Sequence, residues 1–210
     1  MKLIFATGNP GKLREAQEIL GEGFELVTPA RMGITEDIPE TADTLQGNSL
    51  QKAEYLYERT GCDCFADDTG LEVDLLGGAP GVHTARYAGE SKDFGANMDK
   101  LLREMALRER EAAVARTYGF HTPGVDRKAR FRSVVTLILG GKPHFFEGVM
   151  EGRIALRRSG KGGFGYDPVF IPDAYPGQTA ADITEEQKNE ISHRGNALRA
   201  MAAFLHEGKS

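Results

Sequence analysis

The sequence has only two cysteines among 210 residues, and their spacing excludes the common cysteine-based sites. Cys62 and Cys64 are separated by one residue, which is neither the spacing of a zinc pair nor that of a thioredoxin-like redox motif. Structural disulfides belong to oxidising compartments. The sequence therefore predicts a cytoplasmic protein whose thiols are reduced and serve as small buried apolar side chains.

Long apolar runs and an excess of positive charge are also missing. No stretch reaches the roughly 18 apolar residues of a membrane helix, and Gly8–Gly11 interrupts the apolar start before it has the length of a signal-peptide core. Lysine and arginine number 26 against 31 aspartate and glutamate residues, a formal net charge of −5. A net anion is poorly suited to non-specific binding of nucleic acid or membrane surfaces, so we expect neither as a partner.

Glycine, in contrast, is abundant, with 26 of the 210 residues, about 12% against an average near 7%. This predicts many left-handed backbone positions, or backbone that lies close to a ligand. Apolar residues make up 40% and charged residues 27% of the chain, an ordinary composition for a folded protein. The length of residues 1–210 allows either one large domain or two small lobes.

The order of expected strands and helices predicts an α/β protein with a mixed sheet. A long acidic loop is expected at residues 29–47, and a helix extension followed by an exposed loop at residues 107–128. Gly140-Gly141 predicts a hairpin turn, and Thr184 with Gln187 predicts a capping box. The expected strands are Lys2–Thr7, Phe24–Thr28, Cys64–Ala66, Leu71–Leu75, Phe131–Leu139, His144–Ile154 and Val169–Ile171, and the expected helices are Lys12–Leu20, Asn48–Thr60, Phe94–Arg110 and one through Ala197–Leu205.

The first candidate site is the loop Thr7-Gly8-Asn9-Pro10-Gly11-Lys12, which follows a strand and opens a helix. Backbone N–H groups at a helix start favour an anion, and a lysine adds a full charge. The loop is not a P-loop, because that motif requires glycine where Ala6 stands and serine or threonine where Leu13 stands. The alternative is a tight turn with a solvated lysine.

The second candidate site is Asp67-Asp68-Thr69-Gly70, which follows a short apolar run. Adjacent carboxylates repel each other, so such a pair needs a cation or hydrogen-bond donors nearby. Mg²⁺ usually takes one or two carboxylates together with substrate phosphates, and a carboxylate beside it can position or deprotonate a water. The alternative is a turn that caps the end of a strand.

The third candidate site combines Phe164-Gly165-Tyr166-Asp167-Pro168 with Lys188, His193 and Arg194. An aromatic face can stack on a base, and histidine and arginine can donate hydrogen bonds to its carbonyl oxygens. The alternative is ordinary packing together with a solvated charged pair at a helix end.

Together these segments resemble the inosine/xanthosine triphosphate pyrophosphatase family, which removes deaminated purine nucleotides from the precursor pool. The matching stretches follow the family's order and cover nearly the whole chain. They are Phe5-Ala6-Thr7-Gly8-Asn9 with Lys12, Asp67-Asp68-Thr69-Gly70-Leu71, Gly77-Gly78-Ala79-Pro80-Gly81, Thr84-Ala85-Arg86-Tyr87, Phe164-Gly165-Tyr166-Asp167-Pro168 and Ser192-His193-Arg194-Gly195.

The resemblance implies an elongated two-lobed α/β fold with a central mixed sheet flanked by helices, a nucleotide cleft between the lobes, and a homodimer. It implies Mg²⁺-dependent hydrolysis of inosine, deoxyinosine and xanthosine triphosphates (ITP, dITP and XTP) to a monophosphate and pyrophosphate. It also implies roles for individual residues. Asp68 is the metal ligand and water-activating base, and Thr69 lies beside the substrate. Thr7, Gly8, Asn9, Pro10, Gly11, Lys12 and Lys52 hold phosphates; Phe164, Gly165, Tyr166 and Asp167 flank the base; Lys188, His193 and Arg194 read its oxygens.

One stretch, Thr44-Leu45-Gln46-Gly47-Asn48, departs from the family pattern. The family commonly has a metal-binding glutamate directly before this asparagine, where this chain has Gly47. We therefore expect Gln46 to reach the metal directly or through water, or else an acid of the preceding loop to do so. Glu40 and Asp43 are the nearest candidates, and Glu36 is more distant.

Two rival functions remain open at this stage. The first is a nucleotide-sensing binding module that has lost turnover together with the acid expected at Gly47. The second is an α/β phosphatase of sugar phosphates, which releases orthophosphate in place of pyrophosphate. A further departure is the charged stretch at residues 107–128, which is longer than the family pattern and is expected to change a surface or a dimer edge.

Overall fold

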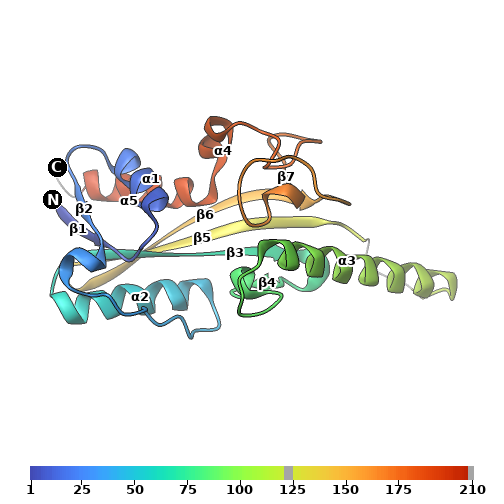
Figure 1. The fold of residues 1–210 in the computed structure, drawn as a ribbon, viewed down its shortest axis with the longest axis horizontal. Helices are drawn as coiled ribbons and strands as arrows, with labels where there is room; N and C mark the ends of the chain where they lie inside the picture. Colours follow the sequence, from blue (N-terminus) through green and yellow to red (C-terminus); the bar gives the residue numbers. More distant parts are fainter. Residues whose placement is uncertain (121–124, 208–210) are drawn as a thin grey trace. The chain divides into compact units, whose positions relative to one another are not determined.

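The computed structural model describes residues 1–120 and 125–207, in which strands and helices form an α/β fold (Figure 1). The strands are β1 (Lys2–Phe5), β2 (Glu25–Val27), β3 (Cys64–Val73), β4 (Pro80–Gly81), β5 (Lys128–Leu139), β6 (Lys142–Ile154) and β7 (Phe170–Pro172). The α-helices are α1 (Pro10–Leu20), α2 (Leu45–Thr60), α3 (Phe94–Thr117), α4 (Glu185–Ile191) and α5 (His193–Glu207).

The described strands form one mixed sheet in the order β2-β1-β3-β5-β6-β7, with β4 paired to β3. β1 runs parallel to both of its neighbours, so that Ile4 lies opposite Val27 on one side and Cys64 on the other. β6 and β7 are antiparallel, with Gly152 opposite Pro172. The predicted α/β class and mixed sheet are confirmed.

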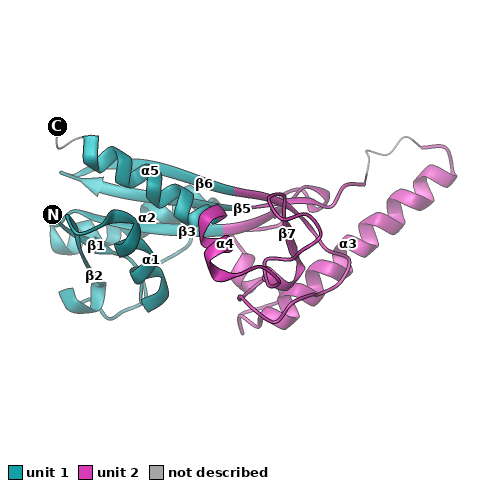
Figure 2. Cartoon of the chain, turned by 90° about the horizontal axis from the view of Figure 1, so that it is seen from above, with its two compact units in different colours: residues 1–69, 132–149, 192–210 teal, residues 70–131, 150–191 magenta. Residues whose placement is uncertain are grey.

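The chain divides into two compact units (Figure 2). Unit 1 comprises residues 1–69, 132–149 and 192–210, and unit 2 comprises residues 70–131 and 150–191. The boundaries fall inside β3, β5 and β6, so each of these strands contributes residues to both units. The single two-lobed domain and the nucleotide cleft between its lobes remain predictions.

In unit 1, helices α1 and α5 lie on one face of the sheet and α2 lies on the other (Figure 1). The α1–α5 face buries Phe5 and Phe65, whose rings stack with centroids 4.3 Å apart. The next strand residue, Ala66, packs on the α2 side with Leu56. This alternation follows the period of two in a strand, and it decides which way each acid of the site points.

Unit 2 has its own core beneath the N-terminal half of α3. Leu101 and Met105 of this helix are fully buried, and they belong to one cluster with Phe131 and Phe170, whose ring centroids lie 4.7 Å apart. The helix extension predicted after Arg110 is confirmed as far as Thr117. The loop predicted after that extension includes residues 121–124, which lie outside the described residues.

The prediction of two short strands at Cys64–Ala66 and Leu71–Leu75 is wrong, because β3 continues from Cys64 to Val73. Asp67-Asp68-Thr69-Gly70 is therefore strand backbone, and the alternative of a turn at this place is excluded. Aspartate and glycine are poor strand formers. Here the strand is buried in the sheet, and cations from neighbouring helices hold the two acidic side chains, so tertiary contacts override the local preference.

Local signals gave one helix start correctly and placed another too late. The capping box is present, since Thr184 N donates to Gln187 Oε1 at 2.9 Å and Gln187 N donates to Thr184 Oγ1 at 3.2 Å. Helix α2 begins at Leu45, before the predicted Asn48, because Thr44 Oγ1 caps it by accepting from Gly47 N at 2.9 Å.

The two cysteines differ in exposure. Cys64 is buried as predicted, whereas Cys62 is exposed and the prediction is wrong for it; neither is in a disulfide. Among residues 1–120 and 125–207, no helix combines the length and the apolar character needed to cross a membrane.

Candidate active site

The glycine loop after β1 is organised by its own side chains. Asn9 is the N-cap of α1, and its Oδ1 accepts from Gly11 N at 2.8 Å and from Lys12 N at 3.4 Å. Thr7 Oγ1 accepts from Asn9 N at 3.1 Å. The loop therefore has a fixed shape at the positive end of a helix, which is the setting predicted for a phosphate.

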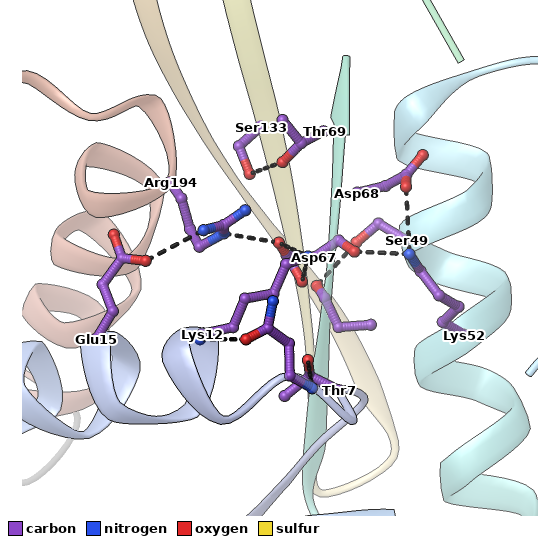
Figure 3. A network of polar contacts seen from close by, with 12 residues as sticks. Thr7, Lys12, Glu15, Ser49, Lys52, Asp67, Asp68, Thr69, Ser133 and Arg194 are labelled. Carbon is purple, nitrogen blue, oxygen red and sulfur yellow. Dashed lines mark hydrogen bonds and ion pairs between the residues drawn. The ribbon is translucent and has the colours of Figure 1, made fainter. Parts of the chain in front are cut away.

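Asp67 turns from β3 toward α1 and α5, where it holds two of the predicted substrate cations (Figure 3). Its carboxylate lies 2.9 Å from Lys12 Nζ and 3.0 Å from Arg194 Nε. Arg194 also pairs with Glu15 at 3.2 Å. Burial acts to raise the pKa of Asp67, but the charges of Lys12, Arg194 and Lys52 outweigh it and hold this pKa well below its usual range. Asp67 is therefore a permanent counter-ion.

Asp68 turns to the opposite face of the strand, toward α2. Its carboxylate lies 3.2 Å from Lys52 Nζ and accepts from Asn48 Nδ2 at 3.3 Å. Burial raises the pKa of Asp68 above its ordinary value, Lys52 lowers it, and the negative charge of Glu40 raises it again. Because neighbouring strand residues face opposite sides, the two acids do not compete for one place, and each has its own cation.

Lys52 connects Asp68 to the acidic loop. Its Nζ lies 2.6 Å from Glu40 Oε1 and donates to the backbone oxygen of Asp67 at 2.7 Å. Burial acts to lower the pKa of Lys52, but the charges of Asp68, Asp67 and Glu40 outweigh it, and the pKa is raised. Of the loop acids considered from the sequence, Glu40 is thus the one that the structure brings to Asp68.

The structure explains why no acid stands at Gly47. A Cβ there would lie 2.7 Å from Ala42 Cβ and 2.9 Å from Thr44 Oγ1, so the loop and the helix cap already fill that space. The side chain of Gln46 is exposed on the first turn of α2. Among the contacts of the described residues none joins it to Asp68, so its metal role stays a prediction.

Thr69 has a partner that the sequence analysis missed. Its Oγ1 donates to Ser133 Oγ at 3.1 Å, and Ser133 is fully buried in β5 (Figure 3). Ser133 lies in a strongly apolar strand, in which it and Thr136 are the fully buried polar residues; a polar residue in such a strand is a weak sequence signal of this kind of contact. Asn48 and Glu15 were missed in the same way, because their partners are distant in sequence.

Unit 2 holds the predicted base-binding residues around Asp167. Its buried carboxylate accepts from Phe164 N at 2.7 Å and from Lys188 Nζ. Lys188 Nζ also lies 4.8 Å from the centroid of the Phe164 ring, within the range of a cation–π contact. At Gly163 the backbone has φ +73°, and a Cβ would lie 2.2 Å from Asp167 Oδ2. This glycine thus leaves room for the carboxylate.

The two aromatic residues of this segment have different roles. Tyr166 is buried in the core of unit 2, and its hydroxyl donates to Thr84 O at 2.9 Å. Burial raises the pKa of this phenol, which keeps it neutral. Phe164 is 64% exposed. Of the two rings, Phe164 is therefore the one that is accessible to stack on a base. Gly165 follows it with φ +63°, a left-handed backbone conformation that favours glycine.

His193 and Arg194 open helix α5, in unit 1. The predicted site residues thus form one group in unit 1, with the residues of the first loop, Lys52, Asp68, Thr69, His193 and Arg194, and one group in unit 2, with Phe164, Gly165, Tyr166, Asp167 and Lys188. The first group offers carboxylates and cations for phosphate chemistry. The second offers a ring, a lysine and a buried acid, which suit a planar polar base.

Comparison with known proteins identifies relatives over almost the whole chain. A model described as the Ham1 family matches residues 3–204. The chain is 50% identical over 204 residues to a dITP/XTP pyrophosphatase of Porphyromonas gingivalis, with 97% of each chain covered. It is 44% identical over 205 residues to one of Flavobacterium psychrophilum, with 98% of this chain and 99% of the relative covered. The solved structure of a HAM1 protein from Coxiella burnetii aligns over 99% of both chains with TM-score 0.86 and 33% identity.

Proposed function

This chain belongs to the Ham1 family, and from that premise we propose that it is a nucleoside triphosphate pyrophosphatase, a hydrolase of deaminated purine nucleotides. The proposed substrates are ITP, dITP and XTP, and the proposed products are the monophosphate and pyrophosphate. The observation that carries the proposal is the separation of Asp67 and Asp68 on the two faces of β3. One acid holds Lys12 and Arg194, and the other lies beside Lys52 and Asn48.

The carboxylates of Asp68 and Glu40 fit a Mg²⁺ site. Both lie against Lys52 Nζ, at 3.2 and 2.6 Å. Mg²⁺ needs only one or two carboxylates when waters and substrate phosphates complete its shell. When bound, Mg²⁺ stabilises the negative charge that develops on the phosphates.

Asp68 is the proposed acceptor of the proton from the attacking water. The carboxylate must be ionised to accept this proton; Lys52 and a bound Mg²⁺ favour the ionised form, whereas burial and Glu40 act to raise the pKa. As the water oxygen bonds to phosphorus, the bond between the α- and β-phosphates breaks and pyrophosphate leaves. The proton released by the water goes to the Asp68 carboxylate.

Lys12 and Lys52 are the proposed cations for the triphosphate. Asp67 orients Lys12 and Arg194, since charge-assisted hydrogen bonds fix both partners. An incoming phosphate then meets cations that are already in place, with less side-chain entropy to lose on binding. Phe164 is proposed to stack on the base, while Lys188, His193 and Arg194 donate to its oxygens. The same proposal includes a cytoplasmic location and a homodimer.

The test is product analysis with ITP, dITP, XTP and adenosine triphosphate in the presence of Mg²⁺. We expect pyrophosphate from the first three. Adenosine carries an amine where inosine carries an oxygen acceptor, and a site that hydrogen-bonds one group can reject its analogue by about 10⁴–10⁵-fold. Orthophosphate as the product would favour a phosphatase, and tight binding of ITP without turnover would favour the nucleotide-sensing module.

A further inference from the structure

Unit 2 exposes two phenylalanine rings that contact each other. Phe94, the first residue of α3, is 48% exposed, and Phe164 is 64% exposed. Their ring centroids lie 6.5 Å apart with 51° between the ring planes, which is within the range of interacting aromatic pairs. A single exposed apolar side chain is ordinary, whereas two large rings in contact form a continuous apolar surface. This surface includes Phe164, the residue proposed to stack on the base.

Phe94 continues the buried stripe of α3 beyond the core of unit 2. Met98, Leu101 and Met105 are the buried apolar residues of this helix. Phe94 precedes Met98 by four residues, so both lie on the same face of the helix. The core nevertheless leaves Phe94 about half in solvent. Burial in the core therefore does not explain why a large ring stands at the start of this helix.

Polar contacts hold the start of α3 beside the loop that carries Phe164. Arg158 lies in this loop, six residues before Phe164. Its Nη2 donates to Gly95 O at 2.7 Å and to Asp99 Oδ1 at 2.5 Å. The helix start and the loop are thus joined by a side chain other than the two rings. The ring of Phe94 is kept in place beside Phe164, so a ligand that contacts both loses less side-chain entropy on binding.

The angle between the rings determines how a planar base can contact both. A base inserted between two parallel rings needs about 7 Å between their planes, twice the contact distance of carbon atoms. Planes inclined by 51° do not form such a slot. A base that stacks on the face of Phe164 instead meets the inclined ring of Phe94 at its edge. Offset stacking and edge-to-face contact are the two arrangements that aromatic rings prefer.

We propose that Phe94 is a second base-binding residue, which contacts the edge of the purine base while Phe164 stacks on its face. The occupant of the two-ring surface is the base of the substrate, because the surface is continuous with Phe164 and a planar aromatic group matches it. This inference rests on the proposed function and adds a residue to the same site. A phenyl ring has no hydrogen-bonding group, so Phe94 strengthens the binding of purine bases and leaves the choice among them to polar side chains.

Binding measured without turnover tests the proposal. Isothermal titration in the presence of EDTA gives the Kd for ITP and for inorganic tripolyphosphate, which has the phosphates but no base. We expect Phe94→Ala to raise the Kd for ITP about 3–10-fold, the loss of one aromatic contact. The Kd for tripolyphosphate should not change, because the proposed phosphate cations Lys12 and Lys52 lie in unit 1. Phe94→Tyr keeps the ring and should retain the wild-type Kd for ITP.

The matched control is Phe145→Ala, which removes a phenylalanine that is 41% exposed in unit 1. Its Kd for ITP should equal that of the wild type. With Mg²⁺ present, Phe94→Ala should raise the KM for ITP by the same factor as the Kd and leave kcat unchanged. This pattern is expected when a contact is equally strong in the ground state and the transition state.

Three outcomes separate this inference from the proposed function. An unchanged Kd for ITP in Phe94→Ala would overturn the inference and leave the pyrophosphatase assignment intact. An equal rise of the Kd values for ITP and tripolyphosphate would also overturn it, because a general disturbance of the fold would then account for the effect. If the wild type releases no pyrophosphate from ITP but Phe94→Ala raises only the Kd for ITP, the base contact is supported and the proposed hydrolysis is contradicted.

Discussion

At the scale of single residues, the environment separates two acids that are identical in type and adjacent in sequence. Asp67 lies among Lys12, Arg194 and Lys52, which hold its pKa well below the usual range. Asp68 is half-buried, and its partial burial and the negative charge of Glu40 raise its pKa although Lys52 acts to lower it. The first acid is therefore a fixed counter-ion, and the second can take up a proton.

Replacing Asp68 by asparagine keeps the shape of the side chain but removes the proton acceptor. We expect Asp68→Asn to lower kcat by about 10²–10⁴-fold, the usual loss of a general base, while ITP still binds. Pyrophosphate release measures the rate, and isothermal titration measures the binding. Asp173→Asn, at an exposed position in unit 2, is the matched control. Wild-type turnover in purified Asp68→Asn protein would remove the assignment.

Glu40 and Gln46 make different predictions for the metal. Glu40→Gln removes one of two carboxylates beside Lys52, so we expect more Mg²⁺ to be needed for half-maximal turnover, because charged oxygen ligands set cation affinity. Gln46→Ala tests the alternative ligand, and it is expected to match the wild type if Glu40 alone completes the site. A Mg²⁺ titration of the rate compares them. A shift for Gln46→Ala as large as that for Glu40→Gln would instead place Gln46 at the metal.

At the scale of elements, one glycine sets how α5 lies on the sheet of unit 1. A Cβ on Gly148 of β6 would lie 2.0 Å from His193 O and 2.5 Å from Ala197 N. The first turn of α5, which carries Arg194, therefore packs directly against strand backbone. No side chain can be inserted at Gly148 without moving the helix start that holds Asp67.

We expect Gly148→Ala to lower the free energy of unfolding by about 1–3 kcal/mol, as overpacking of a tight contact does. Urea unfolding followed by circular dichroism measures this change. Gly8→Ala is the stability control, because a Cβ there has nothing within 4 Å. Equal destabilisation of the two variants would show that the β6–α5 contact tolerates a side chain.

At the scale of the whole molecule, the two units share backbone. β3, β5 and β6 each pass from one unit into the other. Melting these strands in one unit removes the neighbours that satisfy their backbone groups and exposes unpaired edges, which is costly for the remaining half of each strand. The units are thus coupled through continuous strands.

We therefore expect the chain to unfold in one cooperative transition. Hydrogen–deuterium exchange with mass spectrometry along a urea series can follow both units without mutation. Peptides from α1 in unit 1 and from the buried half of α3 in unit 2 should share one urea midpoint. Two separated midpoints would show that each unit folds independently and that the prediction of a single domain is wrong.

The sequence by itself determined the features that depend on neighbouring residues. The hairpin turn at Gly140-Gly141, the capping box of Thr184 and Gln187 and most helices were predicted correctly, because turns and caps form between residues a few positions apart. The order of the motifs also gave the family resemblance. These signals remain readable without any tertiary contact.

Only the tertiary structure decided which side chains of the candidate site pair with one another. Asp67 meets Lys12 across 55 residues and Arg194 across 127 residues of sequence, and no local pattern specifies such pairs. The continuity of β3, the position of Glu40 at Lys52 and the burial of Tyr166 were likewise settled by packing. Strand alternation then put the two adjacent acids on opposite faces of the sheet, which gave each its own charges and its own pKa.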